Sequence, residues 1–127
     1  MATITNEGKV AVAKLLNGTD SVPEFTYMAI GTGSNAEEAT QTALVTETSA
    51  TGLGRAAATC TYDADYKAKW THTFTNNSGD TVGINEMGVF NASSSGTMLL
   101  RHVYAAVQNV LHEGSAEFTA IVTVATS

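Results

Sequence analysis

The sequence predicts a mainly β protein, a compact antiparallel β-sandwich or barrel of about six to eight strands with a short N-terminal helix. Three observations support this prediction. The 127 residues suffice for one domain with a single hydrophobic core. Threonine and glycine, which favour strands and turns, are abundant. Short segments of alternating apolar and polar residues are separated by turn-forming clusters. We therefore expect one β-rich domain over residues 1–127, with residues 1–18 as an N-terminal arm or helix.

The first predicted element is a helix over residues 6–16. Asn6 can serve as its N-cap, Glu7 complements the positive end of the helix dipole, and Asn17-Gly18 provides a C-terminal stop. A helix this short is marginal alone and needs a surface to pack on. It lies either across the end of its own sandwich or, as an arm, against a neighbouring subunit.

Six segments are predicted to be strands. The clearest is residues 69–75, in which Trp70, His72 and Phe74 alternate with threonines and are expected to point inward. The chain between strands is expected to contain a helical turn over residues 35–41, loops at 49–54 and 92–96, and a connection at 105–114. The predicted strands are residues 25–30, 55–62, 69–75, 82–90, 97–104 and 117–124.

Charge and composition exclude several classes of protein. Six basic against twelve acidic residues give a net charge of −6, which argues against nucleic-acid binding because phosphate neutralisation needs clustered Lys and Arg. No apolar run reaches the roughly 18 residues of a membrane span. Charged residues make up only 14% of the chain, where about 25% is typical. Such a neutral surface is typical of a domain packed against copies or partners, or of one at an extracellular or virion surface.

A search for reactive groups finds no catalytic motif. The three histidines lack ligand spacing, and no serine lies in a nucleophile elbow. Cys60 lies in a predicted strand and is expected to be a buried structural thiol. Asp63 and Asp65 are explained by local capping in a turn, with a cation site as the alternative. We expect a non-enzyme with no catalytic, cofactor-binding or metal-binding residues, and a small hydrolase is the remote alternative.

Arg55, Glu86 and Arg101 are the charged residues that need an explanation. Glu86 lies inside an otherwise apolar strand, and a buried acid needs a basic or hydrogen-bonding partner. We expect an ion pair between Glu86 and either Arg55 or Arg101. The alternative is that all three residues face solvent or a neighbouring subunit.

Several segments, in this order, resemble one group of proteins. They are ITNEG at residues 4–8, YMAIGTG at 27–33, LVTE at 44–47, Arg55, INEMGVF at 84–90, GTMLLR at 96–101 and a closing strand at 118–124. The chain resembles small structural proteins of tailed bacteriophages, and related segments occur in tail-fibre and baseplate components. The resemblance covers nearly the whole chain, implies a virion protein, and carries over no catalytic residue.

The leading hypothesis is therefore a capsid decoration or cement protein that bridges capsid subunits. Its partners are the major capsid protein or other virion proteins, it forms a homo-oligomer, and it joins a virion assembled in the host cytoplasm. The alternatives are a tail-tip, baseplate or fibre-attachment module, and a carbohydrate-binding sandwich that stacks sugars on Trp70 and tyrosines. The expected contacts lie in residues 1–6 and in the loops 49–54 and 92–96. The interface candidates are Ile4, Thr5, Asn6, Leu53, Ser94 and Ser95.

Overall fold

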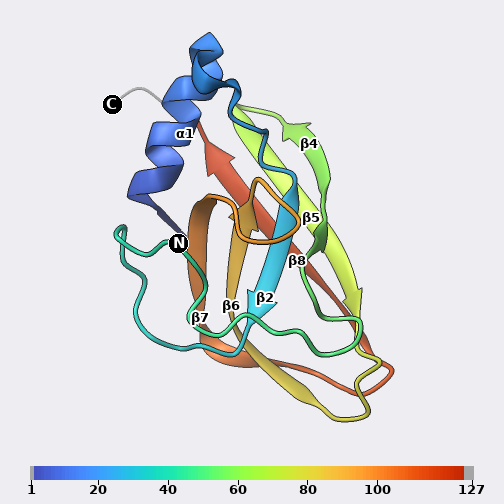
Figure 1. Cartoon of the computed structure of the whole chain (residues 1–127). Coiled ribbons are helices and arrows are strands. Elements are labelled where there is room, and N and C mark those ends of the chain that lie inside the picture. The colour runs from blue at the N-terminus through green and yellow to red at the C-terminus, as the bar shows by residue number, and fades with distance from the viewer. Residues whose placement is uncertain (1, 125–127) are drawn as a thin grey trace.

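Two antiparallel sheets form the body of the protein, with one α-helix near the N-terminus (Figure 1). The computed structural model describes residues 2–124 and confirms the predicted fold class. The larger sheet has the order β1-β7-β6-β2-β3, and the smaller has the order β4-β5-β8. Of the predicted domain, residue 1 and residues 125–127 lie outside the described part. The strands are β1 (Thr3–Ile4), β2 (Tyr27–Gly31), β3 (Ala56–Ala57), β4 (Thr59–Asp63), β5 (Lys67–Thr75), β6 (Val82–Phe90), β7 (Met98–Val110) and β8 (Ser115–Thr123).

The hydrophobic core lies between the two sheets. The predicted alternation in β5 is confirmed, because Trp70 and Phe74 are buried while the intervening threonines are partly or fully exposed. Phe74 packs edge-on against Phe118 of β8, with ring centroids 5.8 Å apart. Met28 and Ile30 of β2 join the same cluster from the larger sheet. The apolar side of each strand therefore faces the other sheet, as period-2 patterning requires.

The predicted strand 55–62 is divided between the sheets. Residues of β3 pair with β2, and those of β4 pair with β5, so the chain changes sheet at Ala58. There the Ala58 N–H donates to the Thr26 carbonyl oxygen. The expected burial of Cys60 is wrong. It lies on β4, an edge strand with exposed residues along nearly its whole length, and Cys60 is exposed like its neighbours.

The helix α1 (Asn6–Asn17) begins one residue earlier than its predicted cap implies. Thr5, rather than Asn6, is the N-cap, because its side-chain oxygen accepts the Gly8 N–H from an extended backbone. Gly18 ends the helix in the left-handed conformation, φ 72°, and its N–H donates to the Lys14 carbonyl oxygen. The helix packs on β7 through Gly8 and Ala11, so it lies on its own sandwich. A short 3₁₀ helix, η1 (Thr19–Ser21), follows.

Strand β7 is longer than predicted. The sequence predicted a strand over 97–104 and a connection over 105–114, but β7 continues to Val110. Its distal half pairs again with the start of β6, where Val82 lies opposite Val110, after an irregularity between Ile84 and Glu86. The irregularity interrupts the alternation of side chains, and the connection is reduced to residues 111–114.

A long segment, residues 32–55, forms no helix or named strand (Figure 1). It passes over the outer face of the larger sheet and then enters the main core at Leu53. We call this segment the cover loop. The helical turn predicted over residues 35–41 is only a hydrogen-bonded turn at 39–40. Leu44 of the cover loop packs with Ala29, Phe90 and Met98 in a small apolar cluster separate from the main core. In the described part of the chain, no helix is long and apolar enough to cross a membrane.

Candidate functional site

A buried ion pair lies beneath the cover loop. Glu86 of β6 and Arg101 of β7 are both fully buried, and the Arg101 Nε lies 2.8 Å from Glu86 Oε1. The register places Arg101 opposite Gly88, two residues along β6 from Glu86, so the two side chains meet diagonally on one face of the sheet. Of the two partners that the sequence offered for Glu86, the structure therefore selects Arg101.

The Glu86 carboxylate also binds the cover loop. It accepts backbone N–H groups from Gly33 at 3.0 Å, from Val45 at 2.9 Å and from Thr46 at 2.7 Å. With Arg101 Nε these bonds provide partners for both oxygens of the buried carboxylate. Glu86 therefore joins the two ends of the loop segment 33–46 to one point on the sheet.

Arg101 holds the middle of the same segment. Its Nη1 donates to the Asn35 carbonyl oxygen at 2.9 Å, and also to the Ala36 carbonyl oxygen and Gln41 Oε1. Its Nη2 is the one buried side-chain polar atom without a partner among residues 2–124. The ion pair therefore binds the backbone of the cover loop with both members: Arg101 donates to carbonyl oxygens, and Glu86 accepts backbone N–H groups.

Two glycines make room for the carboxylate. A Cβ at Gly31 would lie 2.5 Å from Glu86 Oε2 and 2.4 Å from the Thr46 carbonyl oxygen. A Cβ at Gly33 would lie 2.7 Å from the same carboxylate oxygen. The Gly-x-Gly spacing is therefore needed for close approach of the chain to Glu86.

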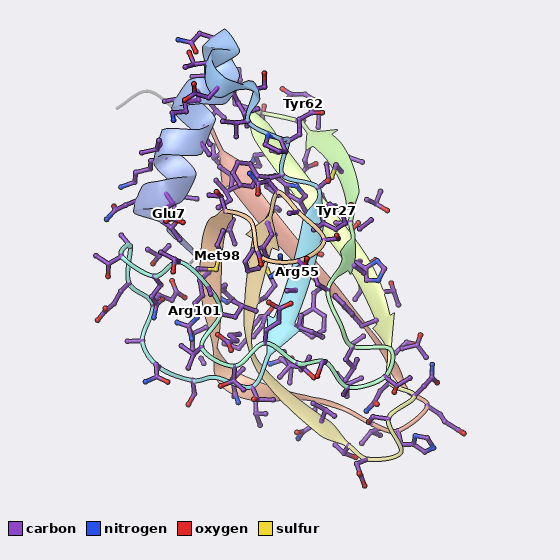
Figure 2. All side chains as sticks on the ribbon, in the orientation of Figure 1. Glu7, Tyr27, Arg55, Tyr62, Met98 and Arg101 are labelled. Carbon is purple, nitrogen blue, oxygen red and sulfur yellow. The ribbon has the colours of Figure 1, made fainter. Side chains whose placement is uncertain are left out.

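Arg55 forms a second, separate pair. It does not contact Glu86; its Nη2 and Nε bind the two oxygens of Glu47 at 2.7 and 3.1 Å. Its Nη1 donates to the carbonyl oxygens of Ala92 and Ser95, and its guanidinium lies 3.7 Å above the Phe90 ring centroid. Arg55 thereby ties the end of the cover loop to the β6–β7 hairpin. Arg55 and Arg101 both lie toward the viewer in Figure 2.

Two acids in these contacts were not predicted to bind other segments; from the sequence, Glu37 was explained by local capping of the turn predicted over residues 35–41. Glu47 binds Arg55, and Glu37 accepts the Thr3 hydroxyl and the Val103 N–H, both at 2.7 Å. His102 Nδ1 lies 3.4 Å from the same Glu37 carboxylate. A signal for Glu47 was available, because the LVTE segment precedes Arg55 in the pattern that carries the resemblance. Glu37 offered no such signal.

The structure corrects two of the interface candidates. Thr5 and Leu53 are both fully buried, so neither can contact a partner. Thr5 caps α1 and donates its hydroxyl to the Met98 carbonyl oxygen, and Leu53 belongs to the main core. Asn6, Ser94 and Ser95 are exposed. Ile4 is half-buried, opposite Leu100 in the sheet, and residue 1 of the predicted contact segment lies outside the described residues.

Groups that could support chemistry are separated. In residues 2–124 no three His, Cys, Asp or Glu side chains are grouped to hold a metal ion. Trp70 is buried, and its Nε1 donates to the Phe25 carbonyl oxygen at 2.7 Å, so its ring is not available as a sugar-stacking platform. The arrangement around Glu86 therefore fixes backbone segments in place and presents no accessible reactive group.

Comparison with protein-family models finds no family that matches the chain, and comparison with curated proteins finds no matching relative. The resemblance to tailed-phage structural proteins therefore stays a prediction. Most segments that carry it meet around the two ion pairs. They contribute Gly31 and Gly33, Glu47, Arg55, Glu86 and Arg101.

Proposed function

We propose that this chain is a non-enzymatic structural protein of a tailed-phage virion, specifically a capsid decoration protein that bridges capsid subunits. Its partner is the major capsid protein, it acts as a homo-oligomer, and its place is the assembled particle. The sequence segments that resemble tailed-phage structural proteins, in the same order along the chain, support the proposal that this is a virion protein. One structural observation, the outward side of α1, supports a role in contacting a larger surface.

Helix α1 has an unusual distribution of apolar residues. Its two buried residues are small, Gly8 and Ala11. Of its larger apolar residues, Leu15 is half-buried against the main core, but Val10 is 55% exposed and Leu16 is 84% exposed. A helix of a stand-alone domain normally buries its larger apolar side chains. Burial of Val10 and Leu16 against a partner would gain roughly 25 cal/mol for each Å² of apolar surface.

The ion-pair arrangement supports the same role. A decoration protein needs a rigid body whose surface segments keep their shape while many copies share the load. Glu86 and Arg101 use two of the few charged residues to fix the cover loop internally, without an exposed reactive group. Because many equivalent copies act together, a modest interface per copy is sufficient.

Copy number tests the proposal directly. The protein is quantified in purified particles against the major capsid protein by mass spectrometry. Hundreds of copies, together with particles that break at lower temperature when the protein is absent, would support a decoration role. A handful of copies would move it to the tail or baseplate, and its absence from particles would overturn the virion proposal.

The role of α1 has its own test. We expect Leu16→Lys to lower binding of the purified protein to particles that lack it, because the lysine places a charge at the contact. Val107→Lys is the matched control, since Val107 is also an exposed apolar residue, 48% exposed, but lies on β7. Equal binding by both variants and the unaltered protein, with all three folded by circular dichroism, would exclude α1 as the contact.

The carbohydrate-binding alternative now depends on tyrosines alone. Tyr62 and Tyr66 are 73% and 71% exposed and line a shallow depression of about 390 Å³ together with Val124. Exposed aromatic rings beside an apolar surface are a platform on which sugars stack. Glycan-array binding that disappears in Tyr62→Ala, while the variant stays folded, would favour this alternative over decoration.

A further inference from the structure

The two sheets differ in width, and the difference leaves one strand uncovered. The smaller sheet has three strands against five, and it ends at β8. Beside β8, between the sheets, lie two depressions of about 280 and 240 Å³. Tyr104 lines both depressions, with Phe118 in the first and Ile121 in the second. The sandwich is thus open along β8, where a further strand of the smaller sheet would lie.

The free edge of β8 is also unprotected. On one side its nine residues pair without interruption with β5. On the other side no hydrogen bond joins its backbone to any segment of residues 2–124. Natural edge strands are usually short, bulged, or guarded by Lys or Pro, because bare N–H and C=O groups recruit other strands. Strand β8 contains no Lys, Pro or bulge, and Glu117 is its one charged residue.

The other sheet edges are handled differently. Strands β1 and β3 have only two residues each. Beyond β1, the Val103 N–H on the edge of β7 is taken by the Glu37 carboxylate. At the start of β4, the Ala58 N–H is bonded to Thr26. In the larger sheet, residues 104–110 of β7 also lack a neighbouring strand on the side of β1. In the smaller sheet, within the described residues, β8 with its nine residues is the longer free edge, against five residues in β4.

We infer that β8 pairs with β8 of a second copy of this chain, antiparallel, across a two-fold axis at Thr119. The symmetry is isologous, so each copy supplies the same edge. The result is one continuous sheet with the order β4-β5-β8-β8-β5-β4. The inference concerns how two copies meet, and it holds whether or not the chain belongs to a virion.

The register follows from the strand itself. Thr119 is the midpoint of Ser115–Thr123, so an axis there pairs all nine residues. It keeps Phe118 and Ala120, which are buried, on the inner face in both copies, because opposite residues of an antiparallel pair point to the same side.

Charge selects the same register. With the axis at Thr119, Thr119 of one copy lies opposite Thr119 of the other, and Glu117 of one copy lies opposite Ile121 of the other. An axis at Glu117 would place two like charges directly opposite each other, which is destabilising, whereas Thr–Thr pairs are favourable. Ile121, 45% exposed in the single chain, gains a neighbour in this arrangement.

Disulfide trapping in a Cys60→Ser background tests the register. Directly opposite residues of an antiparallel pair have Cα atoms about 4.5–5.5 Å apart, within the range of a disulfide. We expect Thr119→Cys to form a covalent dimer on oxidation. Glu117→Cys alone should not form a covalent dimer, because the two cysteines at position 117 are offset by about four residues along the paired strands, roughly 14 Å.

A mixture extends the trapping test. Glu117→Cys mixed with Ile121→Cys should give a crosslinked heterodimer, since these positions are opposite. Thr61→Cys, on the exposed strand β4, is the control for random collision. Crosslinking of Thr61→Cys as fast as Thr119→Cys, or of Glu117→Cys alone, would overturn the proposed register.

Sedimentation equilibrium tests the pairing without covalent bonds. The unaltered protein should be a dimer. Thr119→Lys and Thr119→Glu should each raise the dimer dissociation constant about tenfold or more, because like charges then face each other. A one-to-one mixture of the two variants should restore dimers. A monomeric unaltered protein, or dimers that tolerate both single charges, would overturn the inference.

Discussion

Glu86 shows at the scale of one residue how a charge can be kept in an apolar strand. Three backbone N–H groups and one guanidinium nitrogen bind its two oxygens. A buried ionised carboxylate is tolerated only when such bonds replace its lost water. The residue therefore stabilises less by attraction than by specifying which segments surround it.

Replacing Glu86 should be costly. We expect Glu86→Gln to lower the free energy of unfolding by about 3–5 kcal/mol, because it leaves Arg101 as an uncompensated buried charge and turns an amide toward backbone N–H donors. Urea unfolding followed by tryptophan fluorescence measures the change. The control is Glu47→Gln, whose carboxylate is 31% exposed, with an expected cost of at most about 1 kcal/mol. An unchanged midpoint for Glu86→Gln would contradict the structural role.

The thiol of Cys60 should react slowly despite its exposure. Partial burial of the sulfur, and then the nearby Glu24 carboxylate, raise the pKa of Cys60 above its usual 9.0. Less thiolate is therefore present at pH 8 than in an unperturbed cysteine, and the thiolate is the reactive form. We expect Ellman's reagent to react more slowly with the native chain than with the urea-unfolded chain. A faster reaction in the native chain would contradict this sign.

Helix α1 carries a prediction at the scale of an element. An alanine normally stabilises a helix by about 1 kcal/mol relative to glycine. At Gly8, however, the added Cβ would lie 2.5 Å from the Leu99 carbonyl oxygen, which belongs to the backbone of β7. We therefore expect Gly8→Ala to destabilise the protein.

Thermal unfolding of Gly8→Ala measures this effect. Lys9→Ala, at an exposed position of the same turn, is the control and should leave the midpoint nearly unchanged. A higher midpoint for Gly8→Ala would mean that α1 can move away from β7 at little cost.

The strands were predictable where alternation was local. The bounds of β6 follow from an apolar run between turn-forming clusters, and the inward positions of Trp70 and Phe74 in β5 follow from period-2 patterning. The end of β7 could not be predicted in this way, because its irregular pairing with β6 interrupts the alternation of apolar and polar residues. The division of residues 55–62 between two sheets was equally hidden, since both halves are extended.

The candidate site was predictable only in part. Glu86, Arg55 and Arg101 stood out because charges are scarce in this chain and Glu86 interrupts an apolar strand. The pairing of Arg55 with Glu47 and the course of the cover loop depend on tertiary contacts between segments up to 66 residues apart. Burial of Leu53 has the same origin, since a leucine in a glycine-containing loop gives no local sign of packing into the core.

At the scale of the whole molecule, stability should fall at alkaline pH at the seam between the sheets. Burial raises the pKa of Tyr104, from its usual 10.0, to about 12. The pKa of Tyr104 is higher in the folded protein than in the unfolded chain. The stability that the neutral Tyr104 side chain contributes is therefore fully present below pH 10 and is lost as the pH rises toward 12. We expect the free energy of unfolding to decrease over this window.

Tyr104→Phe isolates that contribution. The phenylalanine has no proton to lose, so the difference in unfolding free energy between the two proteins should change between pH 9 and pH 11.5. Urea titrations at both pH values measure it. A difference that is the same at both would show that the Tyr104 hydroxyl ionises as freely in the folded protein as in the unfolded chain.

The bonds from Glu86 to the cover loop also impose an order of events during protein synthesis. Gly33 and Val45 leave the ribosome 53 and 41 residues ahead of the carboxylate that holds them. The nascent chain therefore carries an unanchored segment, with Leu44 uncovered, until β6 and β7 have both emerged. Arg101 comes 15 residues after Glu86, so the anchor is complete only after residue 101 has also been added to the chain.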